Sequence, residues 1–426
     1  MRHQTPVRWL MKWAETDPDR TALVDRSGRI SYGELAEVVE ERAEALSRDV
    51  AVGHLFPIRV TLDNSTVVEL FAAQVAGGVP LPYTTVVPDQ NDVPGPFDVI
   101  AVPTSGSTGL PRTVRLTDAN IDASVAASRA RHDTTAADCW LLCLPLNHVG
   151  GLSVLWRSFE AGGSVAISPF DDDLPSFMAT ANPTVASMVP TMVHRLIESN
   201  PSALTALRFV LVGGAAMSET LVRTADSLGV RIIQTYGMTE TTSQVATAPR
   251  STRGGAKILD GFLIEILDPQ GLPVPVGETG LITIDGPAVS PGYLGEAARV
   301  GAFKTTDLGY LNADRSVSVL GRADDIVITG GENVSLAKVG DAIIGFEGVS
   351  DAVAIGLPDD EWGTAVAAVV ATGLSEHVLS ELARKVLAPY ERPRQWVVVD
   401  RIPLLENGKH DLATLRALAG MNPASS

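Results

Sequence analysis

A loop of small hydroxyl residues and glycines follows a short apolar run near residue 100 and could wrap phosphate groups. The loop reads TSGSTGLPRTV from Thr104 to Val114, and the apolar run is Val99–Val102. Its candidate phosphate contacts are Thr104, Ser105, Gly106, Ser107, Thr108, Gly109 and Arg112. Glycines allow close backbone approach, hydroxyls donate hydrogen bonds, and a guanidinium complements polyphosphate charge. No Gly-Lys-Ser/Thr follows, so the loop is not a Walker A motif, and a flexible connector is the alternative interpretation.

Three further charged residues have the chemistry of a nucleotide site. Glu240, in YGMTETT, follows the apolar run Val230–Ile233 at a strand's exit, where α/β sheets bind ligands, and could hold Mg²⁺. Asp307, in KTTDLGYL beside an expected turn, could accept hydrogen bonds from ribose hydroxyls. Lys409 follows the tight-turn dipeptide Asn407-Gly408, which places its ammonium near a hairpin-like tip. The alternatives are a solvated loop glutamate, a turn aspartate and a solvated surface lysine.

The pattern of strands and helices predicts what positions these residues. Ser31 followed by YGELAEVVEERAEALSRD indicates a capped amphipathic helix. Strands and helices alternate over residues 31–83, 139–189 and 209–235. This alternation is typical of an α/β fold in which helices cover both faces of a mainly parallel sheet.

The predicted secondary structure changes after residue 254. Residues 254–320 carry short strands separated by Gly, Pro and Asn/Asp pairs, which predict a small antiparallel subdomain. Beyond it the pattern resets toward a smaller α+β domain, and we place the boundary at Arg322–Asp324. The predicted domains are therefore a large N-terminal domain of mixed and parallel sheets at 1–321 and a C-terminal domain at 322–426.

Composition narrows the class of protein. A chain of 426 residues with 45% hydrophobic and 19% charged residues predicts a globular protein of two unequal domains. With 33 Lys+Arg against 50 Asp+Glu, the net charge of −17 argues against nucleic acid and anionic membrane surfaces as partners. Cys139 and Cys143 lack the partners of a zinc site or a disulfide framework. The start has no long apolar segment and no membrane span is evident, so we expect a cytoplasmic protein.

The order and spacing of the motifs are more specific than any one of them. TSGSTGLPRTV, YGMTETT, GRADDIVITGGENV (321–334) and ENGKHDLATLR (406–416), with the N-terminal PDRTALVDRSGRISYGELAE, resemble the acyl-adenylate-forming superfamily. This superfamily comprises acyl-CoA synthetases, peptide-synthetase adenylation domains and luciferases, and the resemblance covers nearly the whole chain. It implies ATP, Mg²⁺ and coenzyme A as cofactors, and a carboxylic acid that is activated as its acyl-AMP.

The resemblance also implies a role for each matching residue in the nucleotide site. The hydroxyl and glycine loop orders around the triphosphate, Glu240 binds magnesium, and Thr239 lies near the α-phosphate. The adenine pocket is lined by Gly213, Gly214, Ala215, Tyr236 and Gly237. Asp307 and Arg322 bind the ribose hydroxyls.

The C-terminal domain is expected to act as a mobile lid. By resemblance, Asp324 is the hinge between the adenylation and thioester-forming orientations, and Lys409 reaches in for the first half-reaction. Its expected work is electrostatic, because the attacking carboxylate and the leaving pyrophosphate gather negative charge. The segment ITGGENV (328–334) replaces the lysine in the second state.

The sequence departs from the superfamily's pattern in two places. The loop usually continues Pro-Lys-Gly, but here Pro111 is followed by Arg112 and Thr113, so we expect altered phosphate release rather than inactivity. The region between Leu81 and Asp98 is also shorter than in typical members.

A further resemblance concerns the acid. LPLNHVGGLSVLWRS (144–158), GGAAMSE and YGMTETTSQVAT are similar to o-succinylbenzoate–CoA ligases of menaquinone biosynthesis. His148 and Arg157 could face a second carboxylate or a polar ring substituent, and His148 is also a catalytic candidate. The alternatives are a capping or packing role for His148 and a surface salt bridge for Arg157. Ser243 and Gln244 are further pocket candidates.

These observations together predict an ATP-dependent carboxylate–CoA ligase with an acyl-AMP intermediate and an aromatic dicarboxylate as leading substrate. Its expected partners are the acid and CoA, without nucleic acid or membrane insertion, and a homodimer is left open. The alternatives are a stand-alone enzyme that loads a carrier protein and a catalytically silent nucleotide-binding homologue.

Overall fold

A large mixed sheet forms the centre of the molecule. The fold was obtained as a computed structural model, and the structure describes residues 4–88, 92–104, 112–248, 254–359, 361–405 and 408–420. The strands follow the order β13-β12-β11-β10-β9-β7-β8-β1-β2, and those from β11 to β1 are parallel. They are β1 (Thr21–Asp25), β2 (Gly28–Ser31), β7 (Cys139–Leu142), β8 (Ser164–Ile167), β9 (Val185–Met188), β10 (Phe209–Val212), β11 (Ile232–Met238), β12 (Ser243–Ala248) and β13 (Lys257–Ile258).

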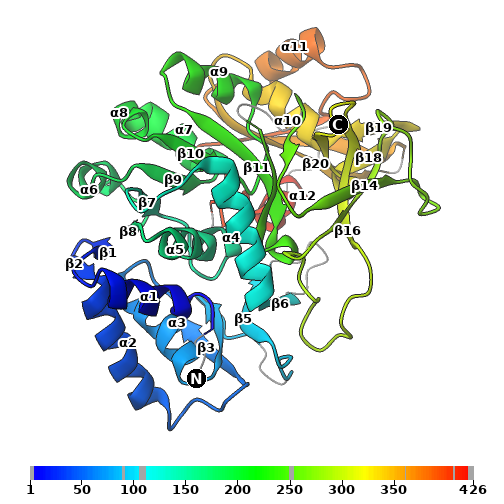
Figure 1. Cartoon of the computed structure of the whole chain (residues 1–426). Helices are drawn as coiled ribbons and strands as arrows, with labels where there is room; N and C mark the ends of the chain where they lie inside the picture. The colour runs from blue at the N-terminus through cyan, green and yellow to red at the C-terminus, as the bar shows by residue number, and fades with distance from the viewer. Residues whose placement is uncertain are drawn as a thin grey trace.

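Helices cover both faces of this sheet, as the sequence predicts (Figure 1). One face packs against α1 (Val7–Thr16), α2 (Tyr32–Leu46), α3 (Asn64–Val75), α4 (Asp118–His132) and α5 (Val149–Ala161). The other packs against α6 (Leu174–Ala181), α7 (Pro190–Ser199), α8 (Pro201–Thr205) and α9 (Glu219–Ser227). Strand β7 shows the alternation directly, because Trp140 and Leu142 face the first set and Leu141 the second.

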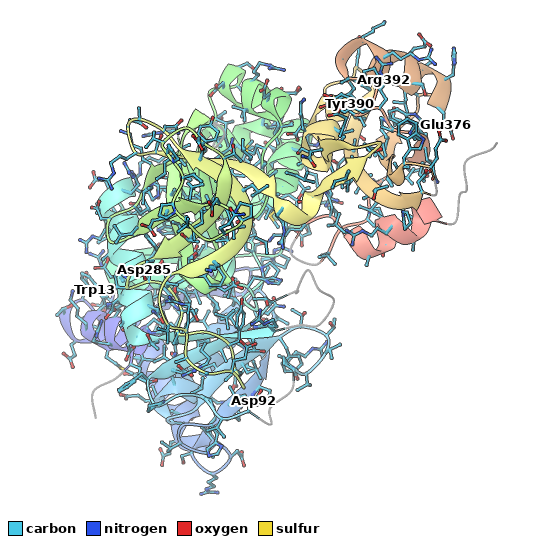
Figure 2. The ribbon with its side chains drawn as sticks, turned by 90° about the vertical axis from the view of Figure 1, so that its right-hand side faces the viewer. Trp13, Asp92, Asp285, Glu376, Tyr390 and Arg392 are labelled. Atoms are coloured by element: carbon cyan, nitrogen blue, oxygen red, sulfur yellow. The ribbon has the colours of Figure 1, made fainter. Side chains whose placement is uncertain are left out.

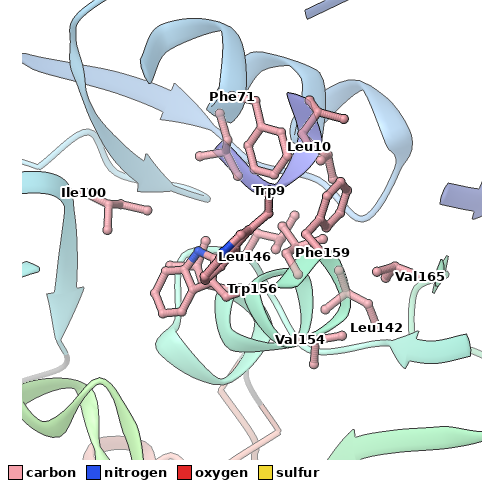
Figure 3. Close-up of a cluster of buried hydrophobic side chains, with 14 of the residues drawn as sticks. Trp9, Leu10, Phe71, Ile100, Leu142, Leu146, Val154, Trp156, Phe159 and Val165 are labelled. Atoms are coloured by element: carbon pink, nitrogen blue, oxygen red, sulfur yellow. The ribbon is translucent and has the colours of Figure 1, made fainter. Parts of the chain in front are cut away.

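Helix α5 is the most enclosed helix of the first face (Figure 3). Its Phe159 makes edge-on contacts with Tyr32 at 5.4 Å and with Phe71 at 5.2 Å between ring centroids. Trp156 is buried beside it. Such aromatic packing fixes the helix axis, and with it the side chains that α5 carries toward the site.

Smaller sheets surround the central one. The parallel pair is β3 (Leu55–Arg59) and β4 (Val79–Tyr83), and the antiparallel pair is β5 (Asp98–Thr104) and β6 (Arg112–Thr117). The antiparallel subdomain has the order β14-β15-β16-β17, with strands β14 (Leu263–Leu267), β15 (Gly280–Asp285), β16 (Phe303–Leu311) and β17 (Val317–Arg322). This is the antiparallel region that the sequence predicts.

The C-terminal part forms a separate lobe with its own apolar clusters (Figure 2). Its elements are β18 (Ile326–Thr329), β19 (Glu332–Ser335), α10 (Leu336–Ile344), β20 (Val349–Asp359), β21 (Gly363–Thr372), α11 (Glu376–Val386), β22 (Gln395–Val399) and α12 (Leu412–Gly420). The expected boundary at Arg322–Asp324 lies between β17 and β18, in the 3-10 turn Ala323–Asp325. Within the described ranges, no helix has both the length and the apolar character needed to cross a membrane.

Candidate active site

Glu240 lies where β11 ends, in the 3-10 turn Thr239–Thr241. Its backbone oxygen accepts a hydrogen bond from the amide of Ser290 at 2.8 Å. The hydroxyl of Tyr293 donates to Glu240 Oε1 at 2.8 Å. Burial, and then the nearby carboxylate, raise the pKa of Tyr293, so this hydroxyl keeps its proton and remains a donor. A cavity of about 270 Å³ opens beside the pair.

Tyr236 and Asp307 come together from different sheets. The Tyr236 hydroxyl donates to Asp307 Oδ2 at 2.7 Å, and burial followed by this carboxylate raises the pKa of Tyr236. Asp307 pairs across the ladder with Arg322, its partner on β17. Asp307 therefore lies inside strand β16 rather than beside a turn, and the expected ribose ligands are neighbours.

The glycine segment after β10 approaches the lysine of the small lobe. Gly214 has a φ of +82°, and a Cβ added there would lie 3.0 Å from Lys409 Cε. Ala215 is exposed next to it. Gly237, in β11, has no room for a side chain because a Cβ would overlap the carbonyl oxygen of Ser243. The absence of a side chain at these glycines permits the close approach of Lys409 and of the Ser243 backbone, and a role in an adenine pocket stays a prediction.

Lys409 is held on the large domain by the turn that carries it. Gly408 has a φ of +76°, and its carbonyl accepts a hydrogen bond from Thr191 Oγ1 at 2.8 Å. Burial lowers the pKa of Lys409, the charge of Arg322 lowers it further, and the charge of Glu240 opposes both. Lys409 therefore lies within electrostatic range of both Glu240 and Arg322.

The predicted phosphate loop is described only at its two ends. Ser105, Gly106, Ser107, Thr108 and Gly109 lie outside the described residues. At the base, Thr104 Oγ1 donates to the carbonyl of Arg112 at 2.9 Å. The Arg112 guanidinium pairs with Glu296 at 2.7 Å and lies 3.3 Å from the ring centroid of Tyr293. A phosphate contact for Arg112 stays a prediction.

Arg157 lies deep in the molecule, 4% exposed, on α5. The surface salt bridge considered from the sequence is therefore wrong. Its guanidinium donates to Ser243 Oγ at 3.0 Å, while its Nε has no hydrogen-bond partner. Burial lowers the pKa of Arg157 to about 9, and among the described residues no carboxylate forms an ion pair with it. Burying a cation without a carboxylate partner costs free energy.

Further polar side chains lie near Arg157. The sequence indicated Gln244 but not Ser128 or His132. Gln244 Oε1 accepts a hydrogen bond from Ser128 Oγ at 2.9 Å. Burial and then the Arg157 charge lower the pKa of His132 to about 3, so this imidazole is neutral. Ser128 and His132 are four residues apart on α4, a spacing that marks one helix face. His148 occupies the N-cap position of α5 without a capping hydrogen bond from its side chain.

The described residues suit Mg²⁺ only if a substrate supplies most of the ligands. In this part of the chain, no group of three or more His, Cys, Asp and Glu side chains could hold a metal alone. A single carboxylate such as Glu240 suits Mg²⁺ when nucleotide phosphate oxygens and water supply the remaining ligands. The donor set therefore fits magnesium bound together with ATP.

Two family descriptions match the chain. The AMP-binding enzyme family matches residues 87–294, and the AMP-binding enzyme C-terminal domain matches residues 338–409. The second match ends at the lysine that reaches Gly214.

Individual proteins are similar over nearly the full length. A 2-succinylbenzoate–CoA ligase of Bacillus cereus is 30% identical, over 94% of this chain and 96% of the relative. The o-succinylbenzoate CoA synthetase (MenE) of Bacillus subtilis, solved with the acyl-adenylate OSB-AMP, has a TM-score of 0.84 and 26% identity, over 96% of this chain and 97% of that one. ATP-bound MatB from Rhodopseudomonas palustris has a TM-score of 0.85 and 25% identity, over 96% and 98%.

Proposed function

Because the chain belongs to the AMP-binding enzyme family, we propose that its acid substrate is o-succinylbenzoate. The chain is an ATP-dependent acid–CoA ligase that uses Mg²⁺ and coenzyme A. The observation that carries the choice of acid is Arg157, a buried cation beside Ser243 and without a described carboxylate partner. An acid with a second carboxylate would supply the missing charge, whereas a fatty acid or a simple benzoate would leave it unpaired.

In the first half-reaction, an oxygen of the substrate carboxylate attacks the α-phosphorus of ATP and pyrophosphate leaves. We assign the nucleotide's ribose to Asp307 and Arg322, and its adenine to the segment beside Tyr236. Lys409 places a positive charge where negative charge gathers, and its approach to Gly214 brings it to this end of the sheet. Magnesium held at Glu240 would neutralise charge on the phosphate oxygens. Thr239, next to that carboxylate, is assigned to the α-phosphate.

In the second half-reaction, the thiol of CoA attacks the acyl carbon, and AMP leaves with the former anhydride oxygen. Lys409 lies against Gly214, so under this proposal the lobe turns before a thiol enters. We assign the hinge to Asp324, whose backbone lies in the turn after β17, and the thiol's approach to residues 328–334. His148, at the start of α5, is assigned to the acid pocket.

The test is product analysis with purified protein. With o-succinylbenzoate, ATP, Mg²⁺ and CoA, we expect the acyl-CoA thioester by mass spectrometry and one AMP per thioester. Thioester on an acyl carrier protein but not on CoA would identify a carrier-loading enzyme instead. Absence of pyrophosphate exchange with aromatic, aliphatic and amino acids alike would indicate a catalytically silent homologue.

Two finer points belong to the same proposal. We expect the enzyme to act in the cytoplasm, where ATP and CoA are available, and fractionation of cells would test this. Light scattering of the purified chain decides whether it is a monomer or the homodimer that the sequence left open.

A further inference from the structure

Tyr293 contacts both Glu240 and Arg112, which lie in two separate sequence motifs. Its hydroxyl donates to Glu240 Oε1 at 2.8 Å, and its ring lies under the Arg112 guanidinium at 3.3 Å. One end of the tyrosine therefore contacts the carboxylate assigned to magnesium. The other contacts the base of the phosphate loop.

The backbone around Tyr293 is hydrogen-bonded to strand β6, the strand that begins at Arg112. Tyr293 forms an isolated bridge with Val114, and the amide of Leu294 donates to the carbonyl of Thr113 at 2.9 Å. The amide of Arg115 in turn donates to the carbonyl of Gly292 at 3.0 Å. Strand β6 thus holds the tyrosine's main chain, and its position does not depend on the ring alone.

The ring is clamped by the residue that departs from the superfamily's pattern. Arg112 pairs with Glu296 at 2.7 Å, which orients the guanidinium plane over the ring. A planar guanidinium stacks on an aromatic face, and a lysine ammonium cannot reproduce that stacking. The Pro-Arg-Thr sequence therefore has a structural consequence at this site.

Glu240 itself needs an external contact to fix its carboxylate. Its 3-10 turn is short, and the following Thr242 and Ser243 both have positive φ. The backbone bond from Ser290 fixes the turn but leaves the side-chain torsions free. The hydrogen bond to Oε1 fixes these torsions and leaves Oε2 as the oxygen to bind an ion.

We propose that Tyr293 is a positioning residue for the metal-binding carboxylate of Glu240, and that Arg112 holds its ring in place. The proposal rests on the assignment of magnesium to Glu240. It predicts that removing the hydroxyl weakens the contribution of magnesium to ATP binding and leaves the metal-free contacts of the nucleotide intact.

The experiment measures ATP binding to the full chain by isothermal titration calorimetry, once with Mg²⁺ and once with EDTA. In the unaltered protein, Mg²⁺ should tighten ATP binding. Tyr293→Phe should reduce this tightening by about tenfold or more, as expected for loss of a hydrogen bond to a charged group. The Kd measured in EDTA should stay unchanged.

Two variants accompany it. Arg112→Gln keeps the hydroxyl but loosens the ring, so it should reduce the magnesium effect by a smaller factor, about two to three. Tyr390→Phe removes a hydroxyl from a tyrosine that is 39% exposed on the small lobe (Figure 2), and it should leave both constants unchanged. Circular dichroism confirms that each variant is folded, and Arg112→Gln serves as the test if Tyr293→Phe does not fold.

Glu240→Gln separates this inference from the proposed function. If it abolishes the magnesium effect, Tyr293→Phe alone reduces that effect, and the double variant loses no more than Glu240→Gln does, the two residues act as a unit and the inference holds. If Glu240→Gln abolishes the effect while Tyr293→Phe and Arg112→Gln leave it intact, the positioning role is overturned alone. If Glu240→Gln itself leaves the effect intact, the metal assignment fails and the inference fails with it.

Discussion

The part of the site assigned to the nucleotide and the part assigned to the acid differ in how their polar groups are paired. At the nucleotide end, polar side chains pair with one another: Tyr236 with Asp307 at 2.7 Å, and Tyr293 with Glu240 at 2.8 Å. At the acid end, Arg157 is buried with an unpaired Nε and without a described acidic partner. Under the proposal, these side-chain pairs at the nucleotide end form without substrate, whereas Arg157 at the acid end gains a charged partner only when the acid binds, so the acid end would carry the selectivity.

The largest expected effect is that of replacing Lys409, which belongs to neither the nucleotide end nor the acid end. Lys409→Ala should lower the rate of pyrophosphate exchange about 10³-fold, because a cation at the transition state is lost. Thioester formation from supplied acyl-AMP should stay near the unaltered rate, since the lysine leaves the site for that step. Rapid-quench measurement of each half-reaction checks this, and equal loss in both would contradict the assigned role.

Arg157→Leu should affect only the acid end. We expect kcat/KM for a dicarboxylate to fall about 10²-fold, since a buried charge pair is lost, while monocarboxylates change little. Arg129→Leu, at an arginine 52% exposed on α4, is the matched control. Steady-state kinetics with dicarboxylates and monocarboxylates measure this difference. An equal loss of kcat/KM for both kinds of acid would show that Arg157 does not bind the second carboxylate.

Asp307→Asn should affect only the nucleotide end. The side chain keeps its shape but loses the charge that accepts the hydrogen bond from Tyr236 and that, under the proposal, accepts those from the ribose. We expect the KM for ATP to rise roughly tenfold with the preference among acids unchanged. A change in acid preference would show that the two ends are coupled.

The smallest effect concerns stability at the acid end. His132 is neutral in the folded protein because burial and the Arg157 charge lower its pKa to about 3, against 6.5 in the unfolded chain. As pH falls from 6.5 toward 3, the unfolded chain gains a proton that the folded chain does not, so stability is present above pH 6.5 and is lost on acidification.

The variant His132→Gln removes this proton linkage. Between pH 6 and 4 its free energy of unfolding should fall less steeply than that of the unaltered protein, by about 1 kcal/mol per pH unit. Urea unfolding at several pH values measures the slopes. Identical slopes would mean that the imidazole is accessible to protons in the folded state.

The sequence predicted helices and strands correctly where the pattern within one element was clear. The helix expected after Ser31 is α2, and both reciprocal capping hydrogen bonds between Ser31 and Glu34 are present. The patterns missed α1, α4, α7, α8 and α12. Pro190 opens α7 directly after β9, and proline suits the first turn of a helix. Asp307 was placed beside a turn because Gly309 follows it, but that glycine marks a bulge within a strand.

The site was harder to predict because it depends on contacts between distant segments. The motifs indicated Glu240, Tyr236, Asp307 and Lys409 individually, but the approach of Lys409 to Gly214 depends on how the lobe docks. The burial of Arg157 could not be foreseen, since α5 is buried on nearly every side and shows no polar face. Tyr293 carried no signal of its own.

The most direct test of the central claim compares two acids that differ by one group. Pyrophosphate exchange is measured with o-succinylbenzoate and with 4-oxo-4-phenylbutyrate, the same acid without its ring carboxylate. If the buried Arg157 completes its pairing with substrate, kcat/KM for the diacid exceeds that for the monoacid by about 10²-fold or more. Equal values for the two acids would contradict the account.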